Sequence, residues 1–589
     1  GIDKAGWKYR VGHAEPSGGI VDWAHVVQPE LDGDFANWIE LHNNGAATVD
    51  IGGWHLTDDR DEAKKGAFPA GTSIEAGGYL VVLADSRDGI PGDYLHTNFG
   101  ISADGEFLAL NDASGDLVSD FGGRYPVQKP FHSYGRSLAD ASVEVYFSQP
   151  TPGAANAGPE LADTVDAPDF EPSGGVYDDT TLVTLTSETE DVVIRYTTDG
   201  SEPTEFHGEI YTSPIVVEAI DEKTGTPIRA RAFKDGFVAS RDKSQTYLVG
   251  VNDVFKNIRT ISLVSDASYA FYAPHGVTTV EGGKGVGDDW RSNGIDDYYM
   301  PDMHGRAFER RVSMELIYPE TGENVQVHGG LRLAASAWSR GRFTLRQTDR
   351  SPWQSSPAEK PSFNMFFRDE YGDEALDHGF VDKYPVQSFT QLRIRAGKND
   401  INNPWIHDEL SRRVMADTGQ FSSVGIQAAL FLNGVYKGFY NPVARLRGDL
   451  FNEFYGGEAD WDVKHIDDWA DGDGEAWAIT EELLDKDLSV FENYQAVIEM
   501  VDPVNIADYF IVNLYGATWD WPHNNFVIAR ERSERGRWRA YMWDAEGTFG
   551  NRGGRPLTYN SMTADLRNPR RDPDDSLGTM WKPLIESPE

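Results

Sequence analysis

The hydrophobic pattern of this 589-residue chain changes near residue 250. Before that point, short runs alternate between apolar and polar residues and are separated by turn-forming Gly, Asp and Ser. After it, strand-like runs are mixed with amphipathic stretches of helical period. The clearest runs before the change are 38–42, 78–83 and 106–110, and the clearest helical stretches after it are 406–418, 478–484 and 505–516. Apolar residues at every second position indicate strands with one buried face. A mixture of this pattern with the helical period indicates α and β structure in one domain.

We therefore predict a multidomain chain with two β-sandwiches of immunoglobulin-like type, followed by an α+β domain. Strands of the second sandwich are expected at 182–185, 193–196, 215–217 and 228–233. A Pro- and Ala-rich stretch between the two sandwiches is typical of a linker. The predicted divisions are an N-terminal segment at 1–18, a sandwich at 19–157, a linker at 158–172, a sandwich at 173–249 and the α+β domain at 250–589.

The charge balance excludes some partners. The chain has 53 Lys and Arg against 95 Asp and Glu, a net charge of −42, so it repels nucleic acid and anionic lipid. Such a charge suits high ionic strength or divalent cations, and solubility alone is the other explanation. The chain has no cysteine, which excludes disulfides and thiolate metal sites. No apolar run is long enough to predict a transmembrane segment.

The two ends of the sequence suggest a longer precursor. The first residue is Gly1, and residues 581–589 are typical of the start of a helix. We expect an N-terminal secretion signal before Gly1 and further sequence after Glu589. The expected location is therefore outside the cell or on its surface.

Residues 34–43 and 49–59 carry a first family resemblance. They read DFANWIELHN and VDIGGWHLTDD, and 68–69, 77–79 and 150–156 continue the pattern. This segment resembles the lamin tail domain. The resemblance implies an immunoglobulin-like sandwich and implies no chemistry.

Residues 196–204, YTTDGSEPT, carry a second resemblance. Here a strand leads into a turn whose backbone is fixed by Asp-Gly and Pro. The segment resembles the small sandwich at the C-terminus of chitobiase-type enzymes. It implies either a passive spacer or carbohydrate contact through residues 173–249. No pair of carboxylates in a recognisable glycosidase setting accompanies it.

The third resemblance covers roughly residues 310–550. Its best stretches are 501–526, 539–550, 431–440 and 360–368. They resemble the CotH kinase family, which implies an atypical protein-kinase-like domain that uses ATP with Mg²⁺ or Mn²⁺. A kinase site needs a cation for the phosphates, oxygen ligands for the metal and a carboxylate that orients the acceptor hydroxyl.

The resemblance assigns these roles to particular residues. Asp520 would orient or deprotonate the acceptor hydroxyl, and Asn525, five residues later as in ordinary kinases, would bind metal with Asp544. Glu546 is a weaker metal ligand, and Lys360 would pair with phosphates. His523 belongs to the same pattern, and bonding a loop carbonyl is the role expected of it. The alternative is that these are turn-forming residues whose spacing arose by chance.

Two departures from the family pattern fall on the nucleotide side. Gly329-Gly330 is followed by Ala334-Ala335-Ser336, where the family has a glycine-containing segment, and Ala444 stands where the family tends to have Glu. Glycines let backbone amides approach phosphate, so their partial loss favours a pseudokinase or unusual nucleotide binding.

Acidic clusters at 58–62, 467–473 and 572–575 offer Ca²⁺ ligands, or they form only a solvated acidic surface.

Two functions remain open from the sequence. The first is a secreted or cell-surface kinase that phosphorylates Ser or Thr of an extracellular protein, with the sandwiches used for attachment. The second is a structural or adhesive scaffold with an inert kinase-like domain, bound to a protein or a surface polymer.

Overall fold

The computed structural model describes residues 37–550, together with 577 and 584. Within 37–550 it leaves out 87–93, 103, 130–131, 287–288, 293, 295–296, 304, 335–359, 398–405, 467, 520 and 523. The chain divides into two compact units. One comprises Gly1–Asp169, Thr186–Arg195 and Arg231–Asp242, and the other Phe170–Leu185, Tyr196–Ala230 and Lys243–Glu589. In the described part of the chain, no helix has both the length and the apolar character needed to cross a membrane.

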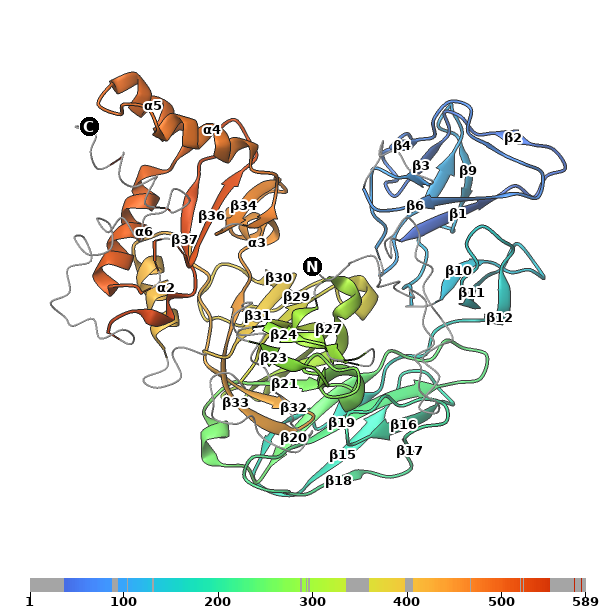
Figure 1. Ribbon diagram of the computed structural model, residues 1–589. Helices are drawn as coiled ribbons and strands as arrows, with labels where there is room; N and C mark the ends of the chain where they lie inside the picture. Colours follow the sequence, from blue (N-terminus) through green and yellow to red (C-terminus); the bar gives the residue numbers. More distant parts are fainter. Residues whose placement is uncertain are drawn as a thin grey trace. The chain divides into compact units, whose positions relative to one another are not determined.

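The first unit is β-rich, as predicted (Figure 1). Its strands form sheets of order β1-β6-β7, β4-β3-β8-β9, β2-β5 and β10-β11-β12. Their bounds are β1 Trp38–His42, β2 Val49–Asp50, β3 His55–Thr57, β4 Gly66–Ala67, β5 Ser73–Ile74, β6 Tyr79–Leu83, β7 Leu95–His96, β8 Ala109–Asn111, β9 Leu117–Asp120, β10 Ser133–Arg136, β11 Glu144–Gln149 and β12 Ala157–Leu161. The strand predicted at 38–42 is confirmed, whereas the one predicted at 106–110 begins only at Ala109.

The segment 158–172, predicted as a linker, contains most of β12. This strand pairs with β11 in antiparallel register, with Leu161 opposite Tyr146. β12 lies at the edge of its sheet, so Pro159 can sit in it although it has no N–H to donate. A Pro-rich composition therefore does not prevent this segment from pairing.

Residues 169–249 form two further sheets, of order β13-β15-β18 and β14-β20-β19-β16-β17. Their bounds are β13 Asp169–Glu171, β14 Gly175–Tyr177, β15 Thr181–Thr186, β16 Val193–Thr197, β17 Glu209–Ile210, β18 Ile215–Val217, β19 Thr226–Phe233 and β20 Lys243–Val249. Buried and less buried residues alternate along β15, where Thr181, Val183 and Leu185 are buried. All four strands predicted in this region are confirmed.

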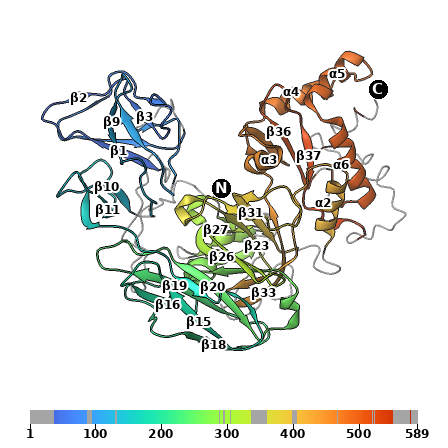
Figure 2. The same ribbon diagram turned by 180° about the vertical axis from the view of Figure 1, so that it is seen from behind.

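A closed seven-stranded barrel follows, which the sequence did not predict. Its order is β21-β26-β27-β28-β31-β33-β32, and Figure 2 shows β26, β27, β31 and β33 grouped together. Its strands are β21 Thr260–Val264, β26 Arg310–Tyr318, β27 Glu323–Ala334, β28 Ser362–Phe366, β31 Gln391–Arg395, β32 Ala428–Leu432 and β33 Val435–Ala444. Parallel pairing of β21 with β32, from Thr260↔Ala429 to Leu263↔Leu432, closes it. Closure removes the sheet edges.

Short hairpins lie beside the barrel strands in the sequence. They are β22 Val280–Glu281 with β25 Tyr298–Tyr299, β23 Lys284–Val286 with β24 Asp289–Arg291, and β29 Leu376–Asp377 with β30 Ser388–Phe389.

Gly329 and Gly330 lie inside β27, where they serve packing. A Cβ on Gly329 would stand 2.6 Å from Cε of Met365, and one on Gly330 would stand 2.4 Å from the Tyr371 ring. Both contacts are too close for a larger residue without movement of the neighbours. These glycines are thus explained by the barrel wall, and the segment that follows at 335–359 lies outside the described residues.

The mixed α/β part of the second unit combines a four-stranded sheet, β35-β34-β36-β37, with the helices α2 to α6 of the described residues. The bounds are β34 Trp461–His465, β35 Asp468–Asp471, β36 Phe526–Glu531, β37 Arg539–Met542, α2 His407–Asp417, α3 Gly448–Tyr455, α4 Glu475–Leu484, α5 Phe491–Met500 and α6 Pro503–Gly516. The three predicted helices are confirmed as α2, α4 and α6. In both views α2 lies alongside α6, and it packs against α6 and β37.

Local chemistry explains where α6 begins and ends. Asp502 caps its first turn by accepting a hydrogen bond from the Asn505 amide at 3.1 Å, and Pro503 stands where no N–H is needed. Ala517 adopts a left-handed conformation after Gly516 and stops the helix. The buried face of α6 carries Ile506, Tyr509 and Phe510, which fixes the helix over the sheet.

Candidate functional site

Two of the predicted site residues lie at the open end of the β36–β37 hairpin. Phe526 pairs with Met542, so Asn525, just before β36, is brought next to the residues that follow β37. The Asn525 side chain donates from Nδ2 to the backbone carbonyl of Asp544 at 3.2 Å. Both residues are left-handed, with φ of 55° and 54°. Asn and Asp adopt this left-handed conformation more readily than other non-glycine residues.

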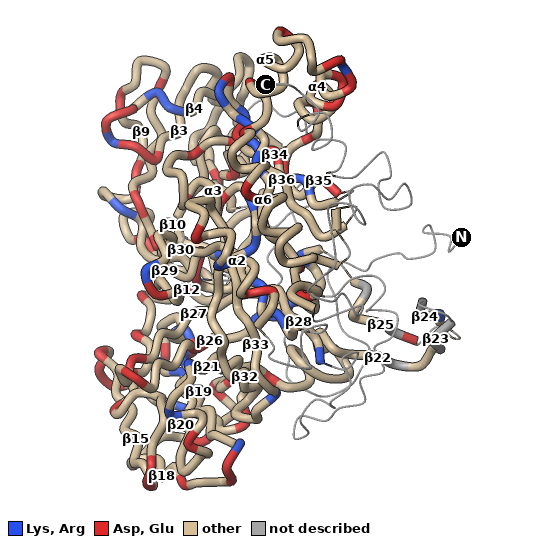
Figure 3. Tube along the Cα trace, turned by 90° about the vertical axis from the view of Figure 1, so that its left-hand side faces the viewer, with Lys and Arg blue, Asp and Glu red and all other residues tan. Residues whose placement is uncertain are grey.

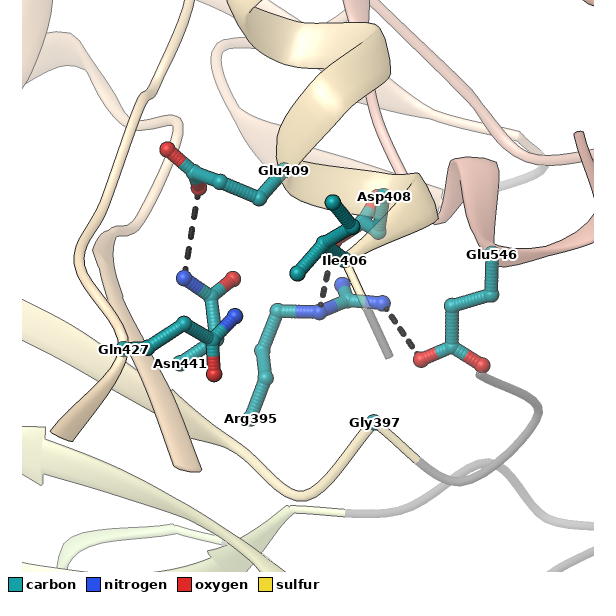
Figure 4. A pocket seen from close by; sticks show the side chains of 8 residues that line it. All are labelled: Arg395, Gly397, Ile406, Asp408, Glu409, Gln427, Asn441 and Glu546. Carbon is teal, nitrogen blue, oxygen red and sulfur yellow. Dashed lines mark hydrogen bonds and ion pairs between the residues drawn. The ribbon is translucent and has the colours of Figure 1, made fainter. Parts of the chain in front are cut away.

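A guanidinium from the barrel holds the two predicted acidic residues. Nη2 of Arg395, the last residue of β31, lies 2.6 Å from Oδ1 of Asp544 and 2.9 Å from Oε1 of Glu546. Its Nε lies 3.0 Å from Oδ2 of Asp408. Figure 4 shows Arg395 pointing between the start of α2 and Glu546. Burial disfavours the charge of Arg395, but the three carboxylates outweigh it and raise its pKa.

The first turn of α2 supplies the third carboxylate of this group. Asp408 is buried and accepts a hydrogen bond from the Ala545 amide at 2.8 Å, and Arg412 lies 3.0 Å away. Burial would raise the pKa of Asp408, but Arg395 and Arg412 overcome it and lower the pKa.

A small pocket opens beside these residues, with a cavity volume of about 10 Å³, room for roughly one water molecule. Glu409 and Asn441 complete its wall, joined by a hydrogen bond of 3.2 Å.

Lys360, which precedes β28, faces the same region. Its Nζ donates to the carbonyls of Ala396, at 3.0 Å, and Phe439, and lies 4.4 Å from the centre of the Tyr440 ring. Burial lowers the pKa of Lys360 to about 7, although the charge of Glu546 acts in the opposite direction. The contacts of Lys360 that the structure shows are thus two backbone carbonyls and the Tyr440 ring.

Comparison with known families matches three segments of the chain. The lamin tail domain matches residues 15–123, the chitobiase/beta-hexosaminidase C-terminal domain matches 172–244, and the CotH kinase protein family matches 340–589. The chain carries these three domains, in that order. Its C-terminal region is a CotH kinase family domain. No curated protein matches the chain.

Membership of a kinase family implies ATP use, and kinases bind ATP together with a divalent metal that needs oxygen ligands. The Asp544 side chain is 39% exposed, and in the part of the chain that the structure describes its Oδ2 and Asn525 Oδ1 accept no hydrogen bond. These two oxygens suit a hard divalent cation. Glu546, which is buried against Arg395, is better placed to orient that arginine than to bind metal.

Some predicted ligands cannot be placed. Asp520 and His523 lie outside the described residues, as do Asp467 and the acidic residues of 572–575. Among the residues that are described, no group of three His, Asp or Glu could hold a metal ion. In the 58–62 cluster, Asp58 pairs with Lys65 at 2.6 Å and Asp59 accepts from the Asp61 amide. The Ca²⁺ expectation therefore stays a prediction.

Sequence reasoning missed the residues that organise this candidate site. Arg395 was not predicted, and neither were Asp408 and Arg412. The sequence did carry a signal for Arg395. Apolar and charged residues alternate over 392–395, LRIR, and the two apolar residues are buried in the barrel. Two arginines on the other face of such a strand indicate a charged surface that needs partners. Asp408 gave no comparable signal, since acidic residues are common in the first turn of any helix.

Proposed function

We propose that the C-terminal domain is an atypical protein kinase that transfers phosphate from ATP to Ser or Thr of an extracellular protein. The CotH match and the pairing of Asn525 with Asp544 at the end of one hairpin support this proposal. The finer fold assignment, a kinase-like α+β domain preceded by two immunoglobulin-like sandwiches, is part of the same proposal. So are secretion or cell-surface location and attachment through the N-terminal modules.

In this proposal Asn525 and Asp544 hold Mg²⁺ or Mn²⁺, which neutralises the phosphates and orients them. Asp520 positions the acceptor hydroxyl and takes its proton. Lys360 contributes a positive charge toward the phosphates. Arg395 fixes the direction of the Asp544 carboxylate, because it holds one oxygen at 2.6 Å and leaves the other toward solvent.

The test is metal-dependent ATP binding by calorimetry, together with phosphate transfer to the protein itself or to Ser/Thr peptides. Asp544→Asn should abolish metal-dependent binding, because it removes a charged ligand. Asp520→Asn should keep binding and lower transfer by on the order of 10²-fold, as loss of a positioned base does. Asp417→Asn, at an exposed position at the end of α2, is the matched control and should behave as the wild type. A wild-type chain that binds no ATP with Mg²⁺ or Mn²⁺ would refute the kinase proposal.

A second candidate function, an inert scaffold, is favoured by one observation. Arg395 already pairs with both Asp544 and Glu546, and Lys360 already donates to two carbonyls. A nucleotide would have to compete with these contacts. The scaffold would attach to an extracellular protein or a surface polymer, with carbohydrate contact through 173–249 as one route. Absence of both ATP binding and phosphate transfer, with binding to a purified polysaccharide, would support it.

A further inference from the structure

Four arginines converge on the outer face of the barrel, in a group that no predicted site residue belongs to. Arg332 of β27 is paired with Asn364 of β28, and Asn364 is paired with Arg393 of β31. Residues directly opposite one another in a sheet point to the same face. Their strand neighbours, among them Leu331, Leu333, Leu392 and Ile394, are buried in the barrel core, so the arginines point outward. Arg445 and Arg447 follow directly after β33, the next strand of the barrel.

Two aromatic rings lie against guanidinium groups of this region, and Arg368, just after β28, joins two members of the group at the first ring. Arg332, Arg368 and Arg445 lie 4.9, 4.9 and 5.4 Å from the centre of the Phe366 ring. Arg393 lies 5.0 Å from the ring of Trp543, the residue before Asp544. The side chains are thus stacked on apolar surfaces and half-buried, which fixes their direction. Figure 3 shows blue Lys and Arg positions close to the label β28.

The negative charge around this group is too small to balance it. Arg447 pairs with Asp471 at 3.1 Å, and Arg332 is 3.8 Å from Glu309, which also pairs with Arg368. Among the described residues, neither Arg393 nor Arg445 has a carboxylate within ion-pair distance. Their partners are the neutral side chains of Asn364, at 3.1 Å, and Gln391.

Two donors of the group also have no hydrogen-bond partner. Nε of Arg332 and Nε of Arg447 are buried, and each lacks an acceptor in the described part of the chain. An unsatisfied buried donor costs free energy, roughly 1–3 kcal/mol. Burial and mutual repulsion also lower the pKa of Arg393 to about 10 and that of Arg445 well below its usual range. The nearby His465 adds no charge, because burial lowers its pKa to about 3.

We propose that Arg332, Arg393, Arg445 and Arg447 form a binding site for a phosphate-class oxyanion. A tetrahedral polyanion offers oxygens in several directions, which suits guanidinium groups that approach from three barrel strands, whereas a single carboxylate would satisfy only one or two of them. In a chain with a net charge of −42, a half-buried group of cations is a local exception, and a bound anion would offset the repulsion among its members. This inference goes beyond the proposed function, since it requires neither metal nor phosphate transfer.

Two sources could supply the oxyanion. Because Arg393 stacks on Trp543, next to Asp544, the first source is the phosphate chain of a nucleotide bound at the CotH site. The second is a separate phosphate-bearing ligand that docks beside that site. Both would be recognised by the same chemistry.

The probe is inorganic tripolyphosphate, titrated calorimetrically into the full chain without divalent metal. We expect binding by the wild type, and binding weakened about tenfold or more by Arg393→Gln or Arg445→Gln, since each removes one charge-assisted contact. Arg393→Lys, which keeps the charge, should recover part of the affinity. Arg535→Gln, at an exposed position in the β36–β37 turn, is the matched control and should bind as the wild type.

A second measurement separates a binding role from a merely structural one. Because the arginines repel one another, Arg393→Gln and Arg445→Gln should leave the melting temperature of the ligand-free chain unchanged or raise it. Absence of tripolyphosphate binding by the wild type, equal binding by the two glutamine variants, or a melting temperature lowered by both would overturn the proposal.

Metal-free ATP that displaces tripolyphosphate identifies the nucleotide as the source, and ATP that leaves it bound identifies a separate ligand. Asp544→Asn should still bind tripolyphosphate. That result would show that the arginine site does not depend on the kinase proposal and stands even if the kinase proposal fails.

Discussion

Two buried carboxylates in the second unit are handled in opposite ways. Glu315, on β26, is surrounded by neutral donors. Its oxygens accept from the Thr246 amide at 2.7 Å, the Thr246 hydroxyl at 2.9 Å and the Ser244 hydroxyl at 3.1 Å. Asp408, in the first turn of α2, faces the guanidinium groups of Arg395 and Arg412. Burial raises the pKa of Glu315, while the two arginines lower that of Asp408 in spite of its burial.

The difference teaches that burial alone does not decide the charge of a group. At Glu315 the neutral partners do not offset the cost of removing the charge from water, whereas at Asp408 the two charged partners do. Lys360 follows the same rule with the opposite sign, because its carbonyl acceptors leave its pKa at about 7. The seam around Glu315 joins β20 to the barrel, and the Arg395 group forms the candidate site. The contact between β20 and the barrel thus rests on neutral polar groups around Glu315, whereas the Arg395 group rests on charged ones.

The largest effect is expected from Arg395→Met. This change leaves Asp408, Asp544 and Glu546 close together without their shared cation. We expect a loss of about 3–5 kcal/mol in the free energy of unfolding, the usual result of breaking a buried pair from one side. Urea denaturation at pH 7 measures it. Arg535→Met is the control, and an Arg395→Met loss no greater than that of this control would show that the acidic group needs no counter-charge.

Asp408→Asn should have a smaller effect, about 2 kcal/mol at pH 7, because Arg395 keeps two other carboxylates. Its pH dependence is the sharper test. A lowered folded pKa means that the stabilisation by Asp408 is present above its unfolded pKa and is lost as the pH falls through the folded value. Wild type and Asp408→Asn should therefore converge in stability toward acid pH, measured by denaturation from pH 7 to pH 3. A constant difference across that range would contradict the assignment.

Lys360→Met should change the dependence of stability on pH, by on the order of 1 kcal/mol for each pH unit above pH 7. Since the folded pKa lies near 7, below the unfolded value near 10.5, the wild type gains stability as the pH rises between these two values. The variant has no such group and should lack this gain. Denaturation curves at pH 7 and pH 9 measure this gain. If the free energy of unfolding changes equally with pH in both proteins, Lys360 stays charged in the folded state.

Glu315→Gln should have the smallest effect, below about 1 kcal/mol, because the amide keeps the shape and most of the hydrogen bonds. A raised folded pKa means that the stabilisation by Glu315 is present below the unfolded pKa and is lost as the pH rises toward the folded value. As the pH rises from 4 to 7, the stability of Glu315→Gln relative to the wild type should therefore increase. For Asp408→Asn, the stability relative to the wild type should decrease over the same range. Thermal unfolding at the two pH values tests this, and the same trend in both variants would break the comparison.

Periodicity was sufficient to predict some of the local elements. The helices α2, α4 and α6 and the strands β15, β16, β18 and β19 appear where their patterns place them, whereas β13, β14, β17, β20, α3 and α5 were not predicted. The barrel was not predicted, because its closure depends on parallel pairing of Thr260–Val264 with Ala428–Leu432, more than a hundred residues away. A short apolar strand carries no information about which distant strand it will join.

The same limit applies to the candidate site. Family resemblance named Asn525 and Asp544, and the β36–β37 hairpin brings these two residues together, while their metal-binding role stays a prediction. Arg395 was missed because its role arises only when β31, α2 and the residues after β37 meet. The sequence shows that an outward-facing arginine needs a partner, but tertiary structure alone selects Asp408, Asp544 and Glu546.

The hairpin formed by β36 and β37 also has a practical consequence. Its open end carries Asn525 and Asp544, and its turn, residues 532–538, lies at the opposite end of the ribbon, about six strand residues or roughly 20 Å away. Glu534 and Arg535 in that turn are exposed. A short peptide tag or a fluorophore inserted there would be carried on the same two strands as the candidate site without touching it. The turn is therefore a suitable attachment point for a reporter that senses ligand binding at the open end.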